Sequence, residues 1–459
     1  MSAVEPEPAA AVADEFTPAY AATLDRGRVA AWAMWDWGSS AFNAVVTSFV
    51  FATYLARSVA VNGAPAGARS GTSWIAIASA ASAILIALAA PVMGQRSDAG
   101  GHRKRNLLIL TGLVVLCMYA MFFVRNDYSF LWLGLVLLSL GSVFSEIASV
   151  SYNAMLNQVS TPRTAGRVSG IGWAAGYVGG IVLLLILFVG LISPKVGWFG
   201  VTSEHGLNIR VAMLFAATWF ALSSIPLMLK VPEVAAAPGQ VKIGIRASYR
   251  KLITDITQLW KADRNAVKFL IASALYRDGL AAVFSFGAVL AGTVWGLSSS
   301  QVILFGIAAN VIAAVGAFLG GLFDDRLGPK VIVMVAIVGL VVACTVLLFV
   351  HSTTLFWVFG LMLSLWVGPA QSSSRVFMSR VAPAGKEGQM FGLYATTGRA
   401  VSFLAPTLVY IFTTVSHADR SAIAAIALVL IIGLIALTQV RAPVQGRAVD
   451  HVEQVTSQV

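Results

Sequence analysis

A short polar motif occurs twice in this chain, between long apolar runs and 227 residues apart, as the positions of Gly94 and Gly321 show. The first copy reads G-x-x-x-D-x-x-G-x-R-K, and the second keeps the spacing of the glycines, the acid and a base. Glycine permits sharp turns and close helix approach, and an acid can cap a helix N-terminus. We therefore predict a duplicated membrane protein whose two motif loops act as conformational gates. The residues that define them are Gly94, Asp98, Gly101, Arg103, Lys104, Gly321, Asp325, Gly328 and Lys330.

The composition fits a membrane protein. The chain is 58% hydrophobic and 11% charged, whereas soluble proteins carry about 25% charged residues. A transmembrane helix needs about 20 apolar residues. We predict an all-α membrane protein with twelve transmembrane helices in two pseudo-symmetric six-helix halves. The expected spans are 29–56, 73–95, 105–125, 129–156, 168–192, 209–230, 267–291, 299–322, 330–350, 354–378, 388–414 and 419–440.

The distribution of Lys and Arg predicts the orientation. Most of the 31 basic residues fall on one side when both termini are placed in the cytoplasm, as the positive-inside rule requires for a cell-membrane protein. This also explains most of the +11 charge, so nucleic-acid binding is an unnecessary interpretation. The expected units are a disordered tail (1–28), two halves (29–230 and 267–440), a linker with a surface helix (231–266) and a second cytoplasmic tail (441–459).

Six ionisable side chains fall within the predicted spans, where charge is costly and needs a partner or a cavity. They are Asp36, Glu146, Asp278, Arg277, Arg375 and Arg399. Polar residues recur at helical spacing on the same faces, among them Asn43, Asn153 and Gln371, and such stripes are typical of a cavity lining. We predict that these nine residues bind substrate or couple protons. The alternative is that the charges form structural ion pairs between the halves.

The duplicated loop resembles the signature loop of the major facilitator superfamily. The resemblance to this superfamily covers nearly the whole chain. A narrower resemblance, to the vacuolar amino-acid effluxer family with its bacterial members, is carried by four segments. These are residues 32–42 (WAMWDWGSSAF), 166–173 (GRVSGIGW), 276–279 (YRDG) and 391–399 (FGLY through Arg399). The resemblance implies a substrate site between the halves, lined by the first, fourth, seventh and tenth helices, and export of neutral amino acids in the fungal member.

We therefore expect a secondary transporter that exports a small polar or zwitterionic, amino-acid-like solute by alternating access, with proton coupling. Arg375 would meet a carboxylate, Asp36 or Asp278 an amine, and Glu146 a proton, whereas Arg399 would be mainly structural. The alternatives are an uncoupled uniporter or exchanger for a sugar, peptide or drug, and a non-transporting sensor. The chain lacks the motifs of intramembrane enzymes and of nucleotide-binding loops, and we expect no metal, no cofactor and a monomer in the lipid bilayer.

Overall fold

In a computed structural model, the chain is described from residue 21 to residue 442. The exceptions within this range are residues 22, 234–246, 251–253, 255–256, 258–260, 262–263 and 384. The predicted tails and most of the predicted linker with its surface helix lie outside the described residues. The residue limits of the predicted domains stay predictions.

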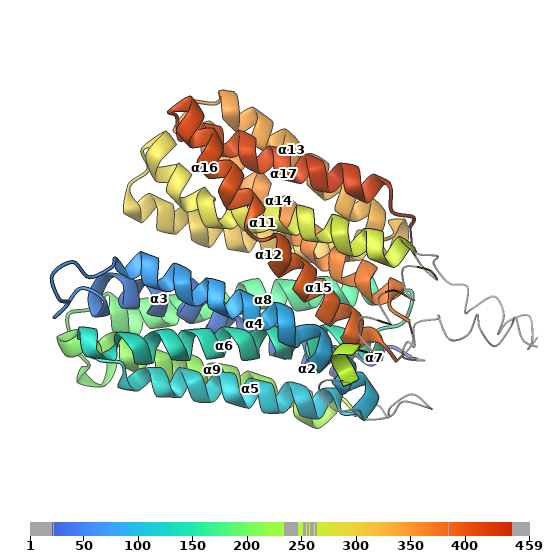
Figure 1. Ribbon diagram of the computed structural model, residues 1–459, viewed down its shortest axis with the longest axis horizontal. Helices are drawn as coiled ribbons and strands as arrows, with labels where there is room; N and C mark the ends of the chain where they lie inside the picture. The colour runs from blue at the N-terminus through green and yellow to red at the C-terminus, as the bar shows by residue number, and fades with distance from the viewer. Residues whose placement is uncertain are drawn as a thin grey trace, which may run out of the picture.

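Twelve helices of the described chain are long and apolar enough to cross a membrane, which confirms the predicted all-α class. The first six spans contain α2 (Arg26–Ser40), α4 (Gly71–Gly100), α5 (Arg103–Ala120), α6 (Leu131–Ala154), α8 (Ala165–Leu187) and α9 (Leu207–Lys230). The second six contain α11 (Arg264–Trp295), α12 (Ser299–Leu327), α13 (Pro329–Phe349), α14 (Thr353–Val381), α15 (Glu387–Val401) with α16 (Leu404–Ser416), and α17 (Ser421–Thr438). The two sets form two groups that converge at one end and diverge at the other (Figure 1).

The halves meet most extensively along two helix pairs, α4 with α15 and α8 with α12, and α14 with α8 and α15 with α6 add smaller contacts. Both main contacts depend on glycine. A Cβ atom added at Gly94 would collide with the backbone of Gly388, and one added at Gly170 would collide with the backbone of Ala317. These contacts lie at the end of the bundle that carries the two motif loops, which we call the loop end. Small residues let the backbones approach closely there, as in other membrane helix interfaces.

Several spans that the sequence predicts as continuous α-helices contain irregular segments, such as the π-helical segment η5 (Phe188–Ile192) at the end of the fifth span. The first span changes from α2 to a π-helical segment, η1 (Ala41–Phe49), before α3 (Phe51–Tyr54) and η2 (Leu55–Val59). The hydroxyls of Thr47 and Ser48 both donate to the carbonyl oxygen of Asn43 within this wider turn. π-Helical segments are frequent at functional sites. The eleventh span breaks between α15 and α16.

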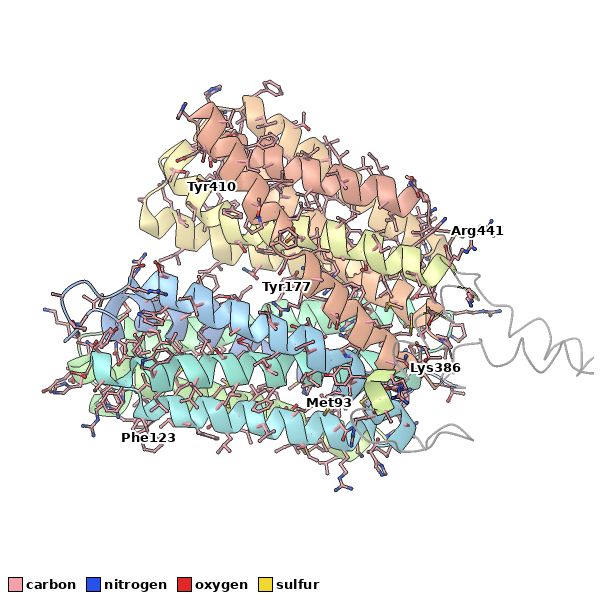
Figure 2. All side chains as sticks on the ribbon, in the orientation of Figure 1. Met93, Phe123, Tyr177, Lys386, Tyr410 and Arg441 are labelled. Carbon is pink, nitrogen blue, oxygen red and sulfur yellow. The ribbon has the colours of Figure 1, made fainter. Side chains whose placement is uncertain are left out.

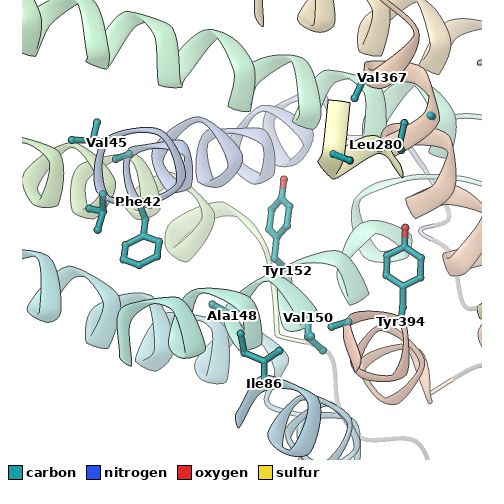
Figure 3. Close-up of a cluster of buried hydrophobic side chains, with 14 of the residues drawn as sticks. Phe42, Val45, Ile86, Ala148, Val150, Tyr152, Leu280, Val367 and Tyr394 are labelled. Carbon is teal, nitrogen blue, oxygen red and sulfur yellow. The ribbon is translucent and has the colours of Figure 1, made fainter. Parts of the chain in front are cut away.

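Apolar side chains fill the space inside each half and the contacts between the halves. Figure 3 shows part of this buried cluster, with Phe42 and Val45 from the first span and Ile86 from α4. Tyr152 of α6 and Tyr394 of α15 belong to the same cluster, and their rings point in the same direction in this view. The core therefore extends to the polar residues between the halves.

Candidate functional site

A cavity of about 830 Å³ lies between the two halves, within the range of small-molecule sites. Its wall extends from Arg375, near the end of α14, to Phe49 in the first span and Leu184 in α8. The lining includes seven of the nine predicted residues, namely Asp36, Asn43, Glu146, Asn153, Arg277, Gln371 and Arg375. Asp278 and Arg399 are not among the lining residues.

The first span contributes the fullest polar stripe to the cavity wall, because Asp36, Ser40, Asn43 and Thr47 all line it. The spacing of these four residues was the signal for this face. Aromatic side chains make up much of the remaining wall, and sequence reasoning did not select them. They include Trp35, Tyr152, Trp173, Tyr177, Phe284, Phe391 and Tyr394. Figure 2 shows Tyr177 between the two groups of helices.

An ion pair between Asp36 and Arg375 joins the halves at the base of the cavity. The Nη1 of Arg375 lies 3.1 Å from Oδ2 of Asp36, and Tyr152 donates its hydroxyl to the same oxygen at 2.8 Å. Arg375 also donates to Ser169, from Nε to Oγ at 2.8 Å and from Nη2 to the carbonyl oxygen at 2.6 Å. Its Nη1 reaches Oδ1 of Asn153 at 3.3 Å. All three nitrogens of this guanidinium therefore have partners within the protein.

Aromatic rings surround the same guanidinium. Its Cζ lies 4.8 Å from the centre of the Trp32 ring and 5.6 Å from that of Trp173. A buried arginine in a membrane protein is costly, and a carboxylate together with aromatic faces reduces this cost. Arg375 is 4% exposed, so the arrangement stabilises contact between α14 and the first half. It fits the structural alternative better than our expectation that Arg375 meets the substrate.

A second ion pair joins the halves at Glu146 of α6 and Arg399 of α15. The Nη2 of Arg399 lies 2.5 Å from Oε2 of Glu146, and the two side chains are 40% and 23% exposed, respectively. This pair is more accessible than the pair of Asp36 with Arg375. Glu146 lines the cavity, whereas Arg399 is not among the lining residues. The carboxylate of Glu146 is therefore accessible from the cavity.

The neighbours Arg277 and Asp278 of α11 have different surroundings. Arg277 lines the cavity, donates from Nη1 to the carbonyl oxygen of Tyr394 at 3.0 Å, and places its Cζ 3.8 Å from the centre of that ring. Asp278 is buried and accepts from the backbone N–H of Ala405 at 2.7 Å, at the start of α16. The structure thus does not bring Asp278 to the cavity, and a role for it in binding an amine has no geometric support.

The two motif aspartates occupy equivalent positions at the loop end. Asp98 accepts from the backbone N–H groups of Gly388 and Gln389, at 3.0 and 2.8 Å, at the start of α15. Asp325 accepts from Gly166 and Arg167, at 2.8 and 3.1 Å, at the start of α8. Each aspartate therefore caps a helix of the opposite half. These caps hold the halves together at the end where the cavity is closed.

The basic residues of the motifs serve different contacts. Arg103 bridges Asp98 of its own loop and Glu387 of α15, with its Nη2 atom 2.7 Å and 2.5 Å from the two carboxylates. Lys104 donates to the carbonyl oxygens of Met228 and Val231, at the end of the sixth span. Lys330 makes the corresponding contact with Thr438, at the end of the twelfth span, over 3.4 Å. Only the arginine therefore adds a contact between the halves.

Sequence reasoning missed several polar residues next to the predicted site. Ser169 lies within the quoted segment 166–173, and Tyr152 directly precedes the predicted residue Asn153, so both positions could have been found there. The buried pair of Asp324 with Arg380, 3.6 Å apart at the loop end, lies near the ends of two predicted spans, where charges are usually solvated. Among the described residues, no three His, Cys, Asp or Glu side chains are placed to hold a metal ion.

Comparisons with known proteins identify the family and the fold of this chain. A family model described as "Vacuole effluxer Atg22 like" matches residues 25–447. The chain is 23% identical to the "Uncharacterized MFS-type transporter YxiO" of Bacillus subtilis (strain 168), over 88% of this chain and 93% of that protein. It is 25% identical to "Autophagy-related protein 22" of Cryptococcus neoformans, over 54% of this chain and 45% of the fungal protein. The match thus spans about half of the fungal relative's length.

Two solved structures share the fold. One is the proton:xylose symporter XylE, bound to 6-bromo-6-deoxy-D-glucose, with a TM-score of 0.70, 12% identity, and coverage of 94% of this chain and 97% of that chain. The other is the fucose:proton symporter FucP of E. coli, with a TM-score of 0.67, 12% identity, and coverage of 90% and 97%. At this identity the likeness shows the fold alone, which is that of the major facilitator superfamily.

Proposed function

Because this chain belongs to the vacuole effluxer Atg22-like family, whose fold is that of major facilitator transporters, we propose that it exports a small amino-acid-like solute. The solute would cross the cell membrane by alternating access, with both termini of the protein in the cytoplasm. The whole cavity lies within one chain, so a monomer is sufficient for transport.

One observation carries this proposal. The cavity between the halves contains charged side chains from both of them and is closed at the loop end by caps that cross between the halves. Charge inside a membrane protein is costly to maintain without a function. Caps made by backbone N–H groups can break and form again as whole helices separate, because no covalent or tightly interlocked contact has to change.

We assign proton coupling to Glu146. Its carboxylate lines the cavity and pairs with Arg399 of the opposite half, so protonation would weaken a contact between the halves. Glu146→Gln mimics the protonated carboxylate. We expect this variant to lose uphill accumulation driven by a pH gradient and to keep solute exchange at equilibrium. Uphill transport with an unchanged pH profile in the variant would place the coupling group elsewhere.

The proposed function is tested with purified protein in liposomes loaded with unlabelled amino acids. We expect counterflow uptake of at least one labelled amino acid, and the same compound should raise the melting temperature of the detergent-solubilised protein. Empty liposomes and liposomes containing heat-denatured protein provide the controls. Counterflow with sugars, peptides or drugs but with no amino acid would favour the alternative substrates.

A further inference from the structure

Two carboxylates and two arginines line the cavity, namely Asp36, Glu146, Arg277 and Arg375, and one of these arginines forms no ion pair with a carboxylate of the described residues. Of the charged side chains described there, Asp36 is paired with Arg375 and Glu146 with Arg399. Arg277 also lines the cavity, and among the described residues no carboxylate lies within ion-pair distance of it. Resting on the proposed function, we propose that Arg277 binds a carboxylate of the solute and that the transported solute carries a net charge of −1.

The surroundings of Arg277 hold its guanidinium in one orientation. Its Cζ lies 3.8 Å from the centre of the Tyr394 ring, and among the described residues its hydrogen-bond partner is the carbonyl oxygen of Tyr394, which accepts from Nη1. Tyr394 is itself fixed, because its hydroxyl lies 2.6 Å from Oγ of Ser374, which lies 2.5 Å from the hydroxyl of Tyr276. A planar guanidinium held in this way suits bidentate recognition of a carboxylate.

The internal duplication explains why Arg277 has no carboxylate partner. Gly38 packs against Ser223 of α9, and Gly279 packs in the same way against Leu430 of α17. This equivalence places Asp36 and Arg277 at corresponding positions, two residues before these glycines. Their neighbours correspond as well, since Gly176 lies beside Asp36 and Gly398 lies beside Arg277.

Asp36 meets the arginine at position 375, and the corresponding position in the first half is occupied by Asn153. The offset is the 222 residues that separate Gly166 from Gly388. The charge of Asp36 is therefore balanced by Arg375 of the opposite half, whereas the position that corresponds to Arg375 offers Arg277 only the neutral amide of Asn153. A carboxylate that enters the cavity can supply the missing negative charge.

The carboxylates nearest to Arg277 have other partners. Glu146 lies within electrostatic range of Arg277 but forms its ion pair with Arg399, so two guanidinium groups share one carboxylate. Asp278, the next residue, is used at the start of α16. Inside the membrane, the carboxylate of a solute of charge −1 pairs with this guanidinium, whereas a neutral zwitterion also brings an ammonium group that needs a partner of its own. This narrows the amino-acid-like class to acidic amino acids and 2-oxo or hydroxy acids.

Matched probes test this on the native protein. Glutamate and glutamine are nearly equal in size and differ by one negative charge, as do 4-methyl-2-oxopentanoate and leucine. We expect the anionic member of at least one pair to bind about tenfold more tightly than its neutral partner, measured by calorimetry on the purified transporter. Equal or tighter binding of both neutral members overturns the proposal and leaves the proposed function intact. If none of the four binds, this proposal fails, whereas the proposed function is decided separately by the counterflow test.

Variants assign the preference to this side chain. Arg277→Gln should abolish the preference for the anion, and Arg277→Lys should keep part of it, because the charge remains but the planar fork is lost. Lys195→Gln removes the same charge from an exposed loop and should bind as the native protein does. A native preference in Arg277→Gln overturns the assignment. If this variant does not fold, the probe pairs on the native protein still decide whether the occupant is an anion.

Discussion

Three arginines lie in or next to the space between the halves, and their partners suggest different roles. Arg375 uses all three of its nitrogens on protein groups and is almost completely buried. Arg399 has one carboxylate partner and is partly exposed. Arg277 is held by one carbonyl oxygen and one aromatic ring. Of the three, Arg277 is the one without a carboxylate partner among the described residues, so it has the most capacity left for a carboxylate of the solute.

These surroundings predict that Arg375 contributes mainly to stability. Arg375→Gln leaves Asp36, which is 19% exposed in the cavity wall, without its counter-charge, and breaking a buried pair on one side typically costs about 3–5 kcal/mol. We expect a clearly lower melting temperature for the purified variant. The double variant Asp36→Asn/Arg375→Gln removes both charges and should recover a large part of the loss.

The opposite result would restore the role that the sequence suggests for Arg375. If Arg375→Gln melts as the native protein does but loses affinity for the transported solute, this arginine is a substrate ligand. Arg277→Gln is the matched comparison, because it removes a guanidinium without breaking one of the two ion pairs described above. We expect it to melt close to the native temperature.

At the scale of single elements, the break in the eleventh span has a local cause. Proline lacks an N–H group, and its ring clashes with the carbonyl four residues earlier. Pro406 therefore disfavours a continuous α-helix at Ser402. The backbone N–H groups at the start of α16 then need other acceptors, and Asp278 provides one for Ala405. The charge at Asp278 thus stabilises an interrupted helix next to the cavity.

This account predicts different effects for two substitutions of Asp278. Asp278→Ala removes the acceptor and should cost about 1 kcal/mol, the usual value for a lost helix cap. Asp278→Asn keeps an acceptor oxygen and should be closer to the native protein. Amide hydrogen exchange over residues 402–408 provides the measurement, with faster exchange expected in the alanine variant only. Equally slow exchange in both variants would show that Asp278 does not hold this helix start.

The sequence predicted the elements better than it predicted their partners. Hydrophobicity located twelve spans because the requirement for apolar residues across a bilayer is strong and local. Pro406 was a local signal for the broken eleventh span, whereas the π-helical turn depends on hydroxyl contacts that periodicity does not reveal. The pairing of Asp36 with Arg375 joins residues 339 positions apart, so only the folded chain could assign it.

At the scale of the whole molecule, the duplication gives a reciprocal closure. Asp98 reaches from the first half to α15 of the second, and Asp325 reaches from the second half to α8 of the first. The two contacts lie at the same end, so they break together when the halves separate there. We infer that their strength sets how much of the protein is closed at the loop end.

Asp98→Asn should therefore fold normally but transport poorly. The asparagine oxygen can accept hydrogen bonds at the start of α15 but carries no charge for Arg103, and a hydrogen bond to a charged group is worth about 1.5–3 kcal/mol. We expect transport rates in liposomes to fall severalfold. Asp419→Asn makes the same chemical change on an exposed loop and should transport as the native protein does. Native rates in both Asp98→Asn and Asp325→Asn would rule out these caps as a latch.

Alternating access can be followed directly with pairs of spin labels. Arg105 and Arg326 are exposed at the loop end, one in each half, and Asn62 and His417 are exposed at the opposite end. Each residue is replaced by a labelled cysteine. Both native cysteines are buried and unpaired, so replacing them with alanine provides the background for labelling.

The decisive measurement is the pair of distance distributions, recorded by pulsed electron resonance in the native background and in the double variant Asp98→Asn/Asp325→Asn. We predict that in the double variant the loop-end distance lengthens while the distance at the opposite end shortens. The same reciprocal change should follow addition of the solute that binds most tightly. Distances that stay the same at both ends, or that lengthen at both ends together, would contradict transport by alternating access to this cavity.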